Sequence, residues 1–144
     1  MGVGPEKESG KILIVDDQPF FIAMATNILK ARGYTVASAL SAKEGIKAAR
    51  TSRPDLIILD VEMPEMDGIA ACHRLKRDPH LKDIPIVILT ATLDPKLNEK
   101  AFRAGAEVTM LKASSADRIL TMVKVVLTTD RTPQARGDVP PPLR

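Results

Sequence analysis

The chain of 144 residues contains no tryptophan, one tyrosine, three phenylalanines and a single cysteine, Cys72. One cysteine excludes an internal disulfide and a zinc site built from several thiolates. A basic surface that stacks bases is also unsupported, because aromatic rings are few and the net charge of +3 is spread along the chain. We therefore predict no direct nucleic-acid contact, and we place Cys72 in the hydrophobic core.

Long hydrophobic runs are missing as well. No apolar stretch approaches the roughly 20 residues that span a bilayer, and residues 1–10 lack the hydrophobic segment of a secretory signal. These absences predict a cytoplasmic protein without membrane insertion. The apolar content of 44% suffices for one core. We expect a tail over residues 1–10, one domain over residues 11–129, and a proline-rich tail over residues 130–144 with too little apolar surface to order itself.

The chain does contain a regular alternation of short apolar runs with segments of helical spacing. Five runs rich in branched residues predict strands over residues 11–15, 34–38, 56–59, 86–89 and 107–111. The first, third and fourth runs are apolar without alternation, as in strands covered by helices on both faces. This order of elements predicts right-handed crossovers and an α/β fold, a doubly wound five-stranded parallel sheet with five helices.

Local signals predict where the five helices begin and which residues they bury. Pro19 suits the first turn of the first helix, and Gly33 suits the left-handed conformation that stops it. We expect this helix to bury an apolar stripe made of Phe20, Ala23, Met24, Ile28 and Leu29. Capping residues predict the starts of the other four helices, namely Ser41, Asp67, Asp94, and Ser115 or Ser114.

Polar side chains follow four of the predicted strands at the point where each strand ends: the pair Asp16 and Asp17, then Asp60, Thr90 and Lys112. Taken singly, such residues are most often turn, capping or surface residues. Together they lie at strand ends that converge on one edge of a parallel sheet, where ligands bind. We therefore predict that three carboxylates, a hydroxyl and an ammonium meet in one site.

This set of groups suits a divalent cation and a phosphoryl group. Neighbouring carboxylates raise one another's pKa unless a cation lies among them, and Mg²⁺ is commonly held by one or two carboxylates together with phosphate oxygens. The third carboxylate, Asp60, can then attack phosphorus and form an aspartyl phosphate. Thr90 and Lys112 are suited to stabilise the charge that develops.

Four short motifs occur in order along the chain: KILIVDD over residues 11–17, DVEMPEMDG over residues 60–68, LTA over residues 89–91, and GAE over residues 105–107 followed by Lys112. In this order and spacing they resemble the receiver domain of two-component response regulators, the family that includes the chemotaxis regulators. The second motif, which resembles the phosphoacceptor loop, is the most specific. The resemblance covers about residues 11–127 and implies the flavodoxin-like strand order 2-1-3-4-5.

The resemblance implies a role for each matching residue. Asp60 would accept the phosphoryl group, and the three carboxylates would hold Mg²⁺ with the backbone carbonyl of Glu62 as a further ligand. The phosphoryl group would be bound by the Thr90 hydroxyl, the Ala91 backbone amide and the Lys112 ammonium. Thr90 would also carry the conformational signal.

The activity implied is that of a signalling switch and not of an enzyme with a separate substrate. The phosphoryl group would come from a histidine kinase or from the phosphohistidine of a phosphotransfer protein. The domain would catalyse only its own phosphorylation and dephosphorylation, and phosphorylation would shift an existing equilibrium that changes the binding of a downstream protein. Asp60→Ala is predicted to abolish acyl phosphate formation.

Two residues depart from the pattern of that family. Ala113 follows Lys112, where the family usually has proline after a cis peptide bond. A cis bond before a residue other than proline costs about 3–4 kcal/mol, so we expect a trans bond and a changed position of Lys112. Thr109 stands at the switch position that commonly carries an aromatic ring, so the usual ring rotation coupled to Thr90 cannot occur in its ordinary form.

The last predicted helix, from Ser115 to about Thr129, is apolar over more than one face. Packing on a sheet alone requires a narrower stripe, so the extra surface indicates either a well-buried helix end or a contact with a partner, such as a homodimer. The partner contact is predicted to be disrupted by Val126→Glu. The apolar residues are Ile119, Leu120, Met122, Val123, Val125, Val126 and Leu127.

Four other interpretations remain open at the level of sequence. The chain could be a pseudo-receiver that binds partners without phosphorylation, which the residues at Thr109 and Ala113 favour, or a receiver cut from a longer regulator. A flavodoxin-like nucleotide-binding domain is less favoured, because residues 17–19 replace a glycine-rich phosphate loop. A haloacid-dehalogenase-type phosphatase would separate the acidic pair, Asp16 and Asp17, by one residue.

Overall fold

Five strands and five helices alternate along the chain in the computed structural model of the protein, which describes residues 9–129. The predicted tail over residues 130–144, and residues 1–8 of the other predicted tail, lie outside the described residues. The strands are β1 (Lys11–Val15), β2 (Thr35–Ala39), β3 (Leu56–Asp60), β4 (Ile86–Thr90) and β5 (Val108–Leu111). The helices are α1 (Pro19–Lys30), α2 (Ala42–Ser52), α3 (Gly68–Arg77), α4 (Pro95–Ala104) and α5 (Ala116–Thr128).

All the strands are parallel and form one sheet in the order β2-β1-β3-β4-β5. The predicted α/β fold class and strand order are therefore confirmed. From β1 the chain first moves outward to β2 and then returns to the other side of β1, so the direction of winding reverses between β1 and β3. In open α/β sheets, ligands bind outside the carboxyl ends of the strands at such a reversal.

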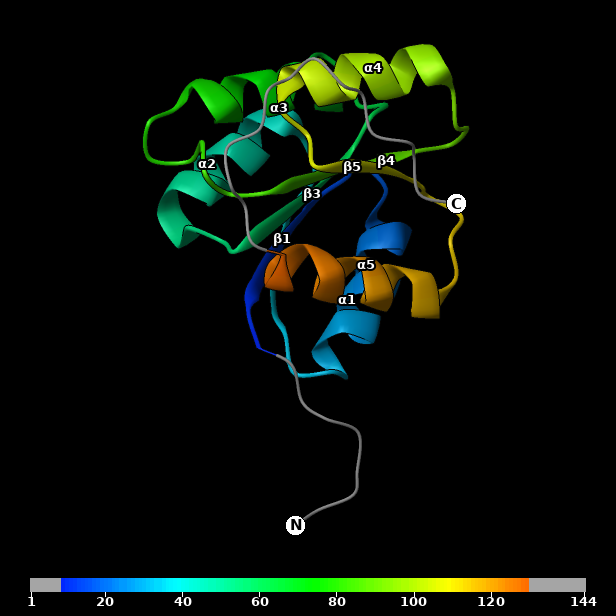
Figure 1. The fold of residues 1–144 in the computed structure, drawn as a ribbon. Helices are drawn as coiled ribbons and strands as arrows, with labels where there is room; N and C mark the ends of the chain where they lie inside the picture. Colours follow the sequence, from blue (N-terminus) through cyan, green and yellow to red (C-terminus); the bar gives the residue numbers. More distant parts are fainter. Residues whose placement is uncertain (1–8, 130–144) are drawn as a thin grey trace.

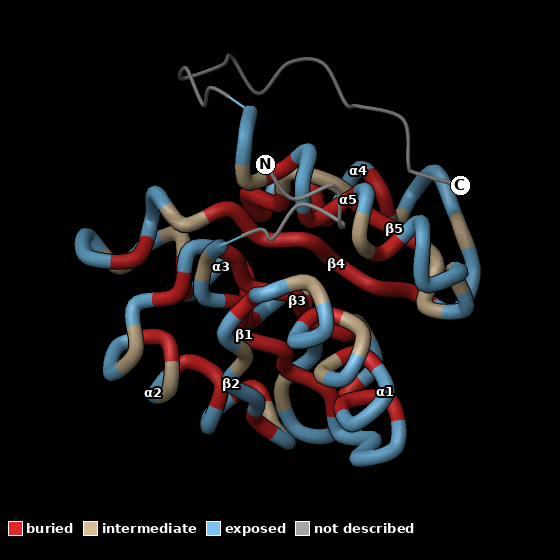
Figure 2. The backbone as a smooth tube through the Cα atoms, turned by 90° about the horizontal axis from the view of Figure 1, so that it is seen from below, coloured by how far each residue is buried: buried red, intermediate tan, exposed pale blue. Residues whose placement is uncertain are grey.

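The sheet is covered on both faces, by α1 and α5 on one side and by α2, α3 and α4 on the other (Figure 1). Successive side chains of a strand point to opposite faces. Accordingly, Leu13 and Val15 of β1 belong to the core beneath α2, α3 and α4, whereas Ile12 and Ile14 belong to the core beneath α1 and α5. Every residue of β3 and β4 is buried, and Figure 2 shows these central strands as buried along their length. This double burial explains the uninterrupted apolar runs.

The strand boundaries differ from the predicted ones by about one residue. β2 begins at Thr35 and not at Tyr34, because the Tyr34 amide donates to the carbonyl oxygen of Leu29 in the turn after α1, 3.2 Å away. β3 and β4 each extend one residue further, to Asp60 and Thr90, since these residues still pair with their neighbouring strands.

The predicted buried face of α1 is wrong. The helix buries Phe21, Ile22, Ala25 and Leu29, so only Leu29 of the predicted stripe is correct. Phe20 is 85% exposed, and Met24 is also exposed. Residues 20–25 are all apolar, and four of them have large side chains, namely Phe20, Phe21, Ile22 and Met24. The sequence pattern therefore fits a stripe shifted by one residue equally well.

Four predicted helix starts are confirmed by side-chain caps. Ser41, Asp67, Asp94 and Ser115 each accept a hydrogen bond from a backbone amide of the following turn. Cys72 is buried within α3, as predicted, and its Sγ donates to the Ala104 carbonyl oxygen at 3.6 Å. Within residues 9–129, no helix has the length and apolar content that crossing a membrane requires.

The burial of individual residues explains why the apolar surface of α5, the last helix, is so broad. Ile119, Met122, Val123 and Val126 are buried against the sheet, with Val126 only 6% exposed. Val125, by contrast, is 54% exposed. The prediction that Val126→Glu disrupts only a partner contact is therefore wrong, because a charge at this buried position would disturb the core of the monomer. Val125 is the outward-facing position.

Candidate functional site

The acidic residues meet at the carboxyl ends of β1 and β3, which are neighbours in the sheet. Asp16 and Asp17 directly follow β1, and Asp60 is the last residue of β3. One carboxylate oxygen from each of the three residues lies within 4.8 Å of the other two. Asp16 and Asp60 are buried, whereas Asp17 is exposed. The cluster is therefore open to solvent on the side of Asp17.

The loop after β3 packs directly onto the backbone of Asp60. A Cβ atom at Gly68 would lie 2.2 Å from the Asp60 carbonyl oxygen, so this position accepts no side chain. The Gly68 amide donates to the Val61 carbonyl oxygen, 2.9 Å away, and Asp67 caps α3 at the same point. Glu65 adopts a positive φ of 70° where the chain reverses. These contacts hold the backbone that carries Asp60 in one conformation.

Lys112 brings a positive charge to the cluster from the end of β5. Its Nζ lies 2.7 Å from Asp16 Oδ2 and 3.5 Å from Asp60 Oδ2. The same atom donates to Gln18 Oε1 at 2.6 Å and lies 4.9 Å from the centre of the Phe21 ring. The Lys112 backbone amide donates to the Thr90 carbonyl oxygen at 2.8 Å. The predicted lysine therefore reaches the carboxylates, as the strand ends indicated.

Electrostatics set Asp60 apart from an ordinary surface carboxylate. Burial raises the pKa of Asp60 from 3.8 to about 6, the charge of Asp16 acts in the same direction, and Lys112 opposes both. A carboxyl group with such a pKa binds a proton more readily near neutral pH than a solvated aspartate does. A cation beside it would favour the charged form, in which it is a nucleophile.

The carboxylates fit a divalent cation. Among residues 9–129, Asp16 Oδ2 is a buried oxygen that accepts no hydrogen bond of proper geometry, even though Lys112 Nζ lies 2.7 Å away. Asp16 Oδ1 already accepts from the Gln18 amide at 2.9 Å. A buried oxygen with spare coordinating capacity next to two further carboxylates is the donor set that a hard cation such as Mg²⁺ uses.

The remaining predicted residues lie around this cluster in less direct positions. Thr90 is buried, and its hydroxyl donates to the Thr92 carbonyl oxygen at 2.8 Å and so bonds within its own loop. Ala91 and Glu62 are exposed on the loops that follow β4 and β3. No peptide bond within residues 9–129 is cis, so the bond between Lys112 and Ala113 is trans, as expected.

Thr109, at the predicted switch position, is buried in β5. Its hydroxyl donates to Asn98 Oδ1 of α4 at 2.8 Å. A hydroxyl at this position therefore makes a fixed contact with the neighbouring helix in place of the ring expected in the family.

Sequence reasoning missed three residues that contact this machinery: Gln18, Phe21 and Asn98. Gln18 directly follows the acidic pair, and this place in the chain is the signal that could have assigned it to the site. Phe21 was hidden by the incorrect phase of α1. Asn98 is a buried polar residue within a helical segment and gives no local signal of its partner in β5.

Comparison with known proteins decides the family. The sequence pattern of the response regulator receiver domain matches residues 12–124. The chain belongs to this family. Receiver domains are signalling modules of two-component systems, and membership sets aside the flavodoxin-like and haloacid-dehalogenase-type interpretations.

Curated relatives of this receiver domain include proteins of two sizes. One is the DNA-binding dual master transcriptional regulator RpaA of Synechocystis, 36% identical over 126 residues, which are 87% of this chain and 52% of that protein. The polar-differentiation response regulator DivK of Brucella anthropi is 29% identical over 116 residues, which are 81% of this chain and 94% of DivK. The chain thus spans about half the length of RpaA (52%) and of the transcriptional regulator PhoP of Bacillus subtilis (48%).

Solved structures agree with the receiver fold. A putative response regulator from Chloroflexus aurantiacus aligns with a TM-score of 0.80 and 32% identity over 85% of this chain and 100% of that chain. The chemotaxis protein CheY4 of Vibrio cholerae aligns with a TM-score of 0.79 and 28% identity over 83% of this chain and 99% of that chain.

Proposed function

We propose that this receiver domain is a phosphorylation-activated switch in which Asp60 accepts a phosphoryl group from a histidine kinase or a phosphotransfer protein. The observation that carries the proposal is the position of Asp60: a buried carboxylate at the sheet edge, with two further carboxylates within 4.8 Å and an ammonium 3.5 Å from its Oδ2. Asp16, Asp17 and the backbone carbonyl of Glu62 would hold Mg²⁺ with Asp60. Bound Mg²⁺ would neutralise charge on the phosphoryl oxygens and on the carboxylates.

In this proposal a carboxylate oxygen of ionised Asp60 attacks phosphorus. The bond between phosphorus and the donor atom breaks, and the donor leaves with its electron pair: imidazole from a phosphohistidine, or acetate from acetyl phosphate. Lys112 pairs with the phosphoryl oxygens, and the Thr90 hydroxyl and the Ala91 amide donate to them. Thr90 must first leave its bond to Thr92, which would couple phosphorylation to movement of the loop after β4.

Phosphorylation of the purified chain by acetyl phosphate with Mg²⁺ is the direct test. Intact mass should increase by one phosphoryl group in the wild type and remain unchanged in Asp60→Ala. Asp83→Ala is the matched control, because Asp83 is an exposed carboxylate in the loop before β4, at the opposite edge of the sheet. A phosphoryl adduct retained in Asp60→Ala would contradict the assignment of Asp60.

A pseudo-receiver that binds its partners without phosphorylation is the second candidate. It is favoured by Thr109, whose hydroxyl bonds to Asn98, and by the trans bond before Ala113. Neither observation removes the groups that phosphoryl transfer needs. Wild-type protein that gains no phosphoryl group and binds no Mg²⁺ would support this second candidate over the first.

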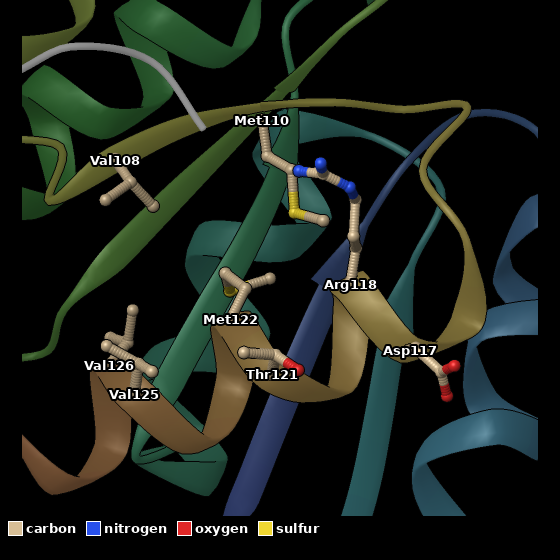
Figure 3. Close-up of a pocket in the computed structure, with 8 residues that line it drawn as sticks. All are labelled: Val108, Met110, Asp117, Arg118, Thr121, Met122, Val125 and Val126. Atoms are coloured by element: carbon tan, nitrogen blue, oxygen red, sulfur yellow. The ribbon is translucent and has the colours of Figure 1, made fainter. Parts of the chain in front are cut away.

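We further propose that the exposed side of α5 and β5 binds a second copy of the chain. A groove of about 420 Å³ lies there, between Val108 and Met110 of β5 and Val125 of α5 (Figure 3). Asp117 and Arg118, consecutive residues in the first turn of α5, both line the groove. In a twofold arrangement, each acidic side chain can pair with the basic side chain of the other copy.

Val125→Glu tests this dimer, because it places charge at an exposed apolar position without entering the core. Light scattering at high protein concentration, measured with unphosphorylated and with phosphorylated protein, should report the mass of a dimer for the wild type in at least one of these states. It should report the mass of a monomer for Val125→Glu in both. Leu40→Glu, at an exposed apolar position after β2, should leave the dimer intact. Equal masses for Val125→Glu and the wild type would remove the dimer proposal.

The output of the switch is a further proposal. RpaA is named a DNA-binding regulator, and the match covers only 52% of it, whereas the match covers 94% of DivK. Both an attached output domain and a separate downstream protein are compatible with this receiver. A cytoplasmic location also stays a prediction.

A further inference from the structure

The position of the Lys112 ammonium depends on contacts outside its own loop. Its side chain is long and flexible, so holding its ammonium in one place costs conformational entropy. It lies just beyond the end of β5 and is followed by Ala113 in a trans peptide, without a proline to restrict the loop. Its ammonium nevertheless lies between the carboxylates of Asp16 and Asp60. A further contact outside these two ion pairs would restrict the ammonium to this position.

Gln18 makes the contact that can do so. Gln18 Oε1 accepts a hydrogen bond from Lys112 Nζ at 2.6 Å, across 94 positions of the sequence. The backbone amide of the same residue donates to Asp16 Oδ1 at 2.9 Å. Gln18 therefore contacts both the acidic cluster, through its backbone, and the lysine, through its side chain.

The helix does not need this side chain. Gln18 is the N-cap residue of α1, yet among the described residues its side chain caps no backbone amide of that helix. The ring of Phe21, one turn further along α1, faces the same ammonium with its centre 4.9 Å from Lys112 Nζ. The start of α1 thus offers Lys112 a neutral acceptor and an aromatic face.

We propose that Gln18 is a positioning residue for Lys112, holding the ammonium beside Asp60 before the phosphoryl group arrives. This rests on the function proposed above. A neutral amide suits the task, because it orients the ammonium without the charge that would compete with the phosphoryl oxygens. A carboxylate at position 18 would bind the ammonium more strongly and withhold it, whereas an apolar side chain would release it.

Three variants separate these possibilities. Gln18→Leu removes the acceptor at similar size, and Gln18→Glu keeps an acceptor but adds charge. Met24→Leu, on the exposed side of the same helix, is the matched control, because it removes no hydrogen-bond acceptor from Lys112. Each protein is measured for phosphorylation by acetyl phosphate with Mg²⁺. Each is also measured, without Mg²⁺, for the rate at which formaldehyde and a borohydride methylate Lys112, read by peptide mass spectrometry.

Loss of one hydrogen bond of this kind predicts that Gln18→Leu is phosphorylated about three- to tenfold more slowly than the wild type. Methylation of Lys112 should be faster in this variant, while methylation of Lys43 is unchanged. Gln18→Glu should also be phosphorylated more slowly, but its Lys112 should be methylated no faster than in the wild type. A role of Gln18 in folding alone would not separate the two measurements in this way.

Several outcomes would overturn the proposal. Unchanged methylation of Lys112 in Gln18→Leu would show that Gln18 does not hold the ammonium, even if phosphorylation slowed. Faster methylation with an unchanged phosphorylation rate would show that the contact does not serve the reaction. A wild type that accepts no phosphoryl group would remove the proposed function and the reaction step of this proposal. The methylation rates would still decide whether Gln18 holds Lys112.

Discussion

At the scale of single residues, Asp60 combines two properties that oppose each other. Its burial at the end of β3 raises its pKa to about 6, which favours the protonated form, yet attack on phosphorus requires the ionised form. Lys112 lowers the same pKa, and a bound cation would lower it further. The reactive form of Asp60 therefore depends on its charged neighbours.

The raised pKa of Asp60 predicts that the free energy of unfolding depends on pH. Folded Asp60 has a pKa of about 6 against 3.8 unfolded, so between these values the folded state binds more protons. Its free energy of unfolding therefore falls as pH rises through this range. Urea unfolding in EDTA should show the wild type losing stability relative to Asp60→Asn between pH 4 and pH 7, by up to about 3 kcal/mol. A difference between the two proteins that stays constant with pH would contradict the raised pKa.

At the scale of secondary-structure elements, α4 and β5 are joined by a buried hydrogen bond from Thr109 to Asn98. Phenylalanine at position 109 has no donor for this bond. Because the loop that leads from Thr90 through Thr92 ends at α4, the bond ties that helix to the sheet next to the site. The position of α4 is thus set by polar contact as well as by apolar packing.

Thr109→Val should destabilise the protein by about 1–3 kcal/mol, because the buried Asn98 oxygen loses this donor while the side chain keeps nearly the same shape. The amide hydrogen-exchange rate in this variant, compared with the wild type, should also increase more in α4 than in α1. Thr121→Val, at an exposed position of α5, should change stability by less than about 0.5 kcal/mol. Equal exchange rates in α4 of Thr109→Val and the wild type would mean that the bond does not hold the helix.

The sequence was most informative where one local signal sufficed. β1, β3 and β4 could be predicted because strands buried on both faces need unbroken apolar runs, and the ends of these strands then located Asp16, Asp60 and Thr90. The buried face of α1 could not be predicted, because the unbroken apolar run after Pro19 does not show which of its residues point toward the sheet.

Hydrogen bonds between segments far apart in the sequence could not be predicted, for a different reason. The bond of Gln18 to Lys112 depends on how β1 and β5 are placed in the sheet, and that of Asn98 to Thr109 depends on how α4 packs on β5. Neither pair has a spacing or motif that marks it. Only the assembled sheet brings these side chains together.

At the scale of the whole molecule, binding of Mg²⁺ to the folded state should stabilise the entire fold. A cation held only by the folded protein raises the free energy of unfolding by about 2.7 kcal/mol at one hundred times its dissociation constant. Thermal unfolding should therefore shift upward with MgCl₂ and much less in Asp16→Asn. NaCl at equal ionic strength is the control, and an equal shift with NaCl would indicate screening of charge and not a site.

The exposed Phe20 gives the molecule a convenient place for an optical probe. The chain has no tryptophan, and Tyr34, its one tyrosine, is buried before β2, at the edge of the sheet opposite the acidic cluster. Tyrosine emission can thus report unfolding while remaining remote from events at Asp60. Phe20→Trp would add a fluorophore two positions after Gln18, on a solvent-facing side chain that the core does not use. The two emissions would separate ligand binding from unfolding in one sample.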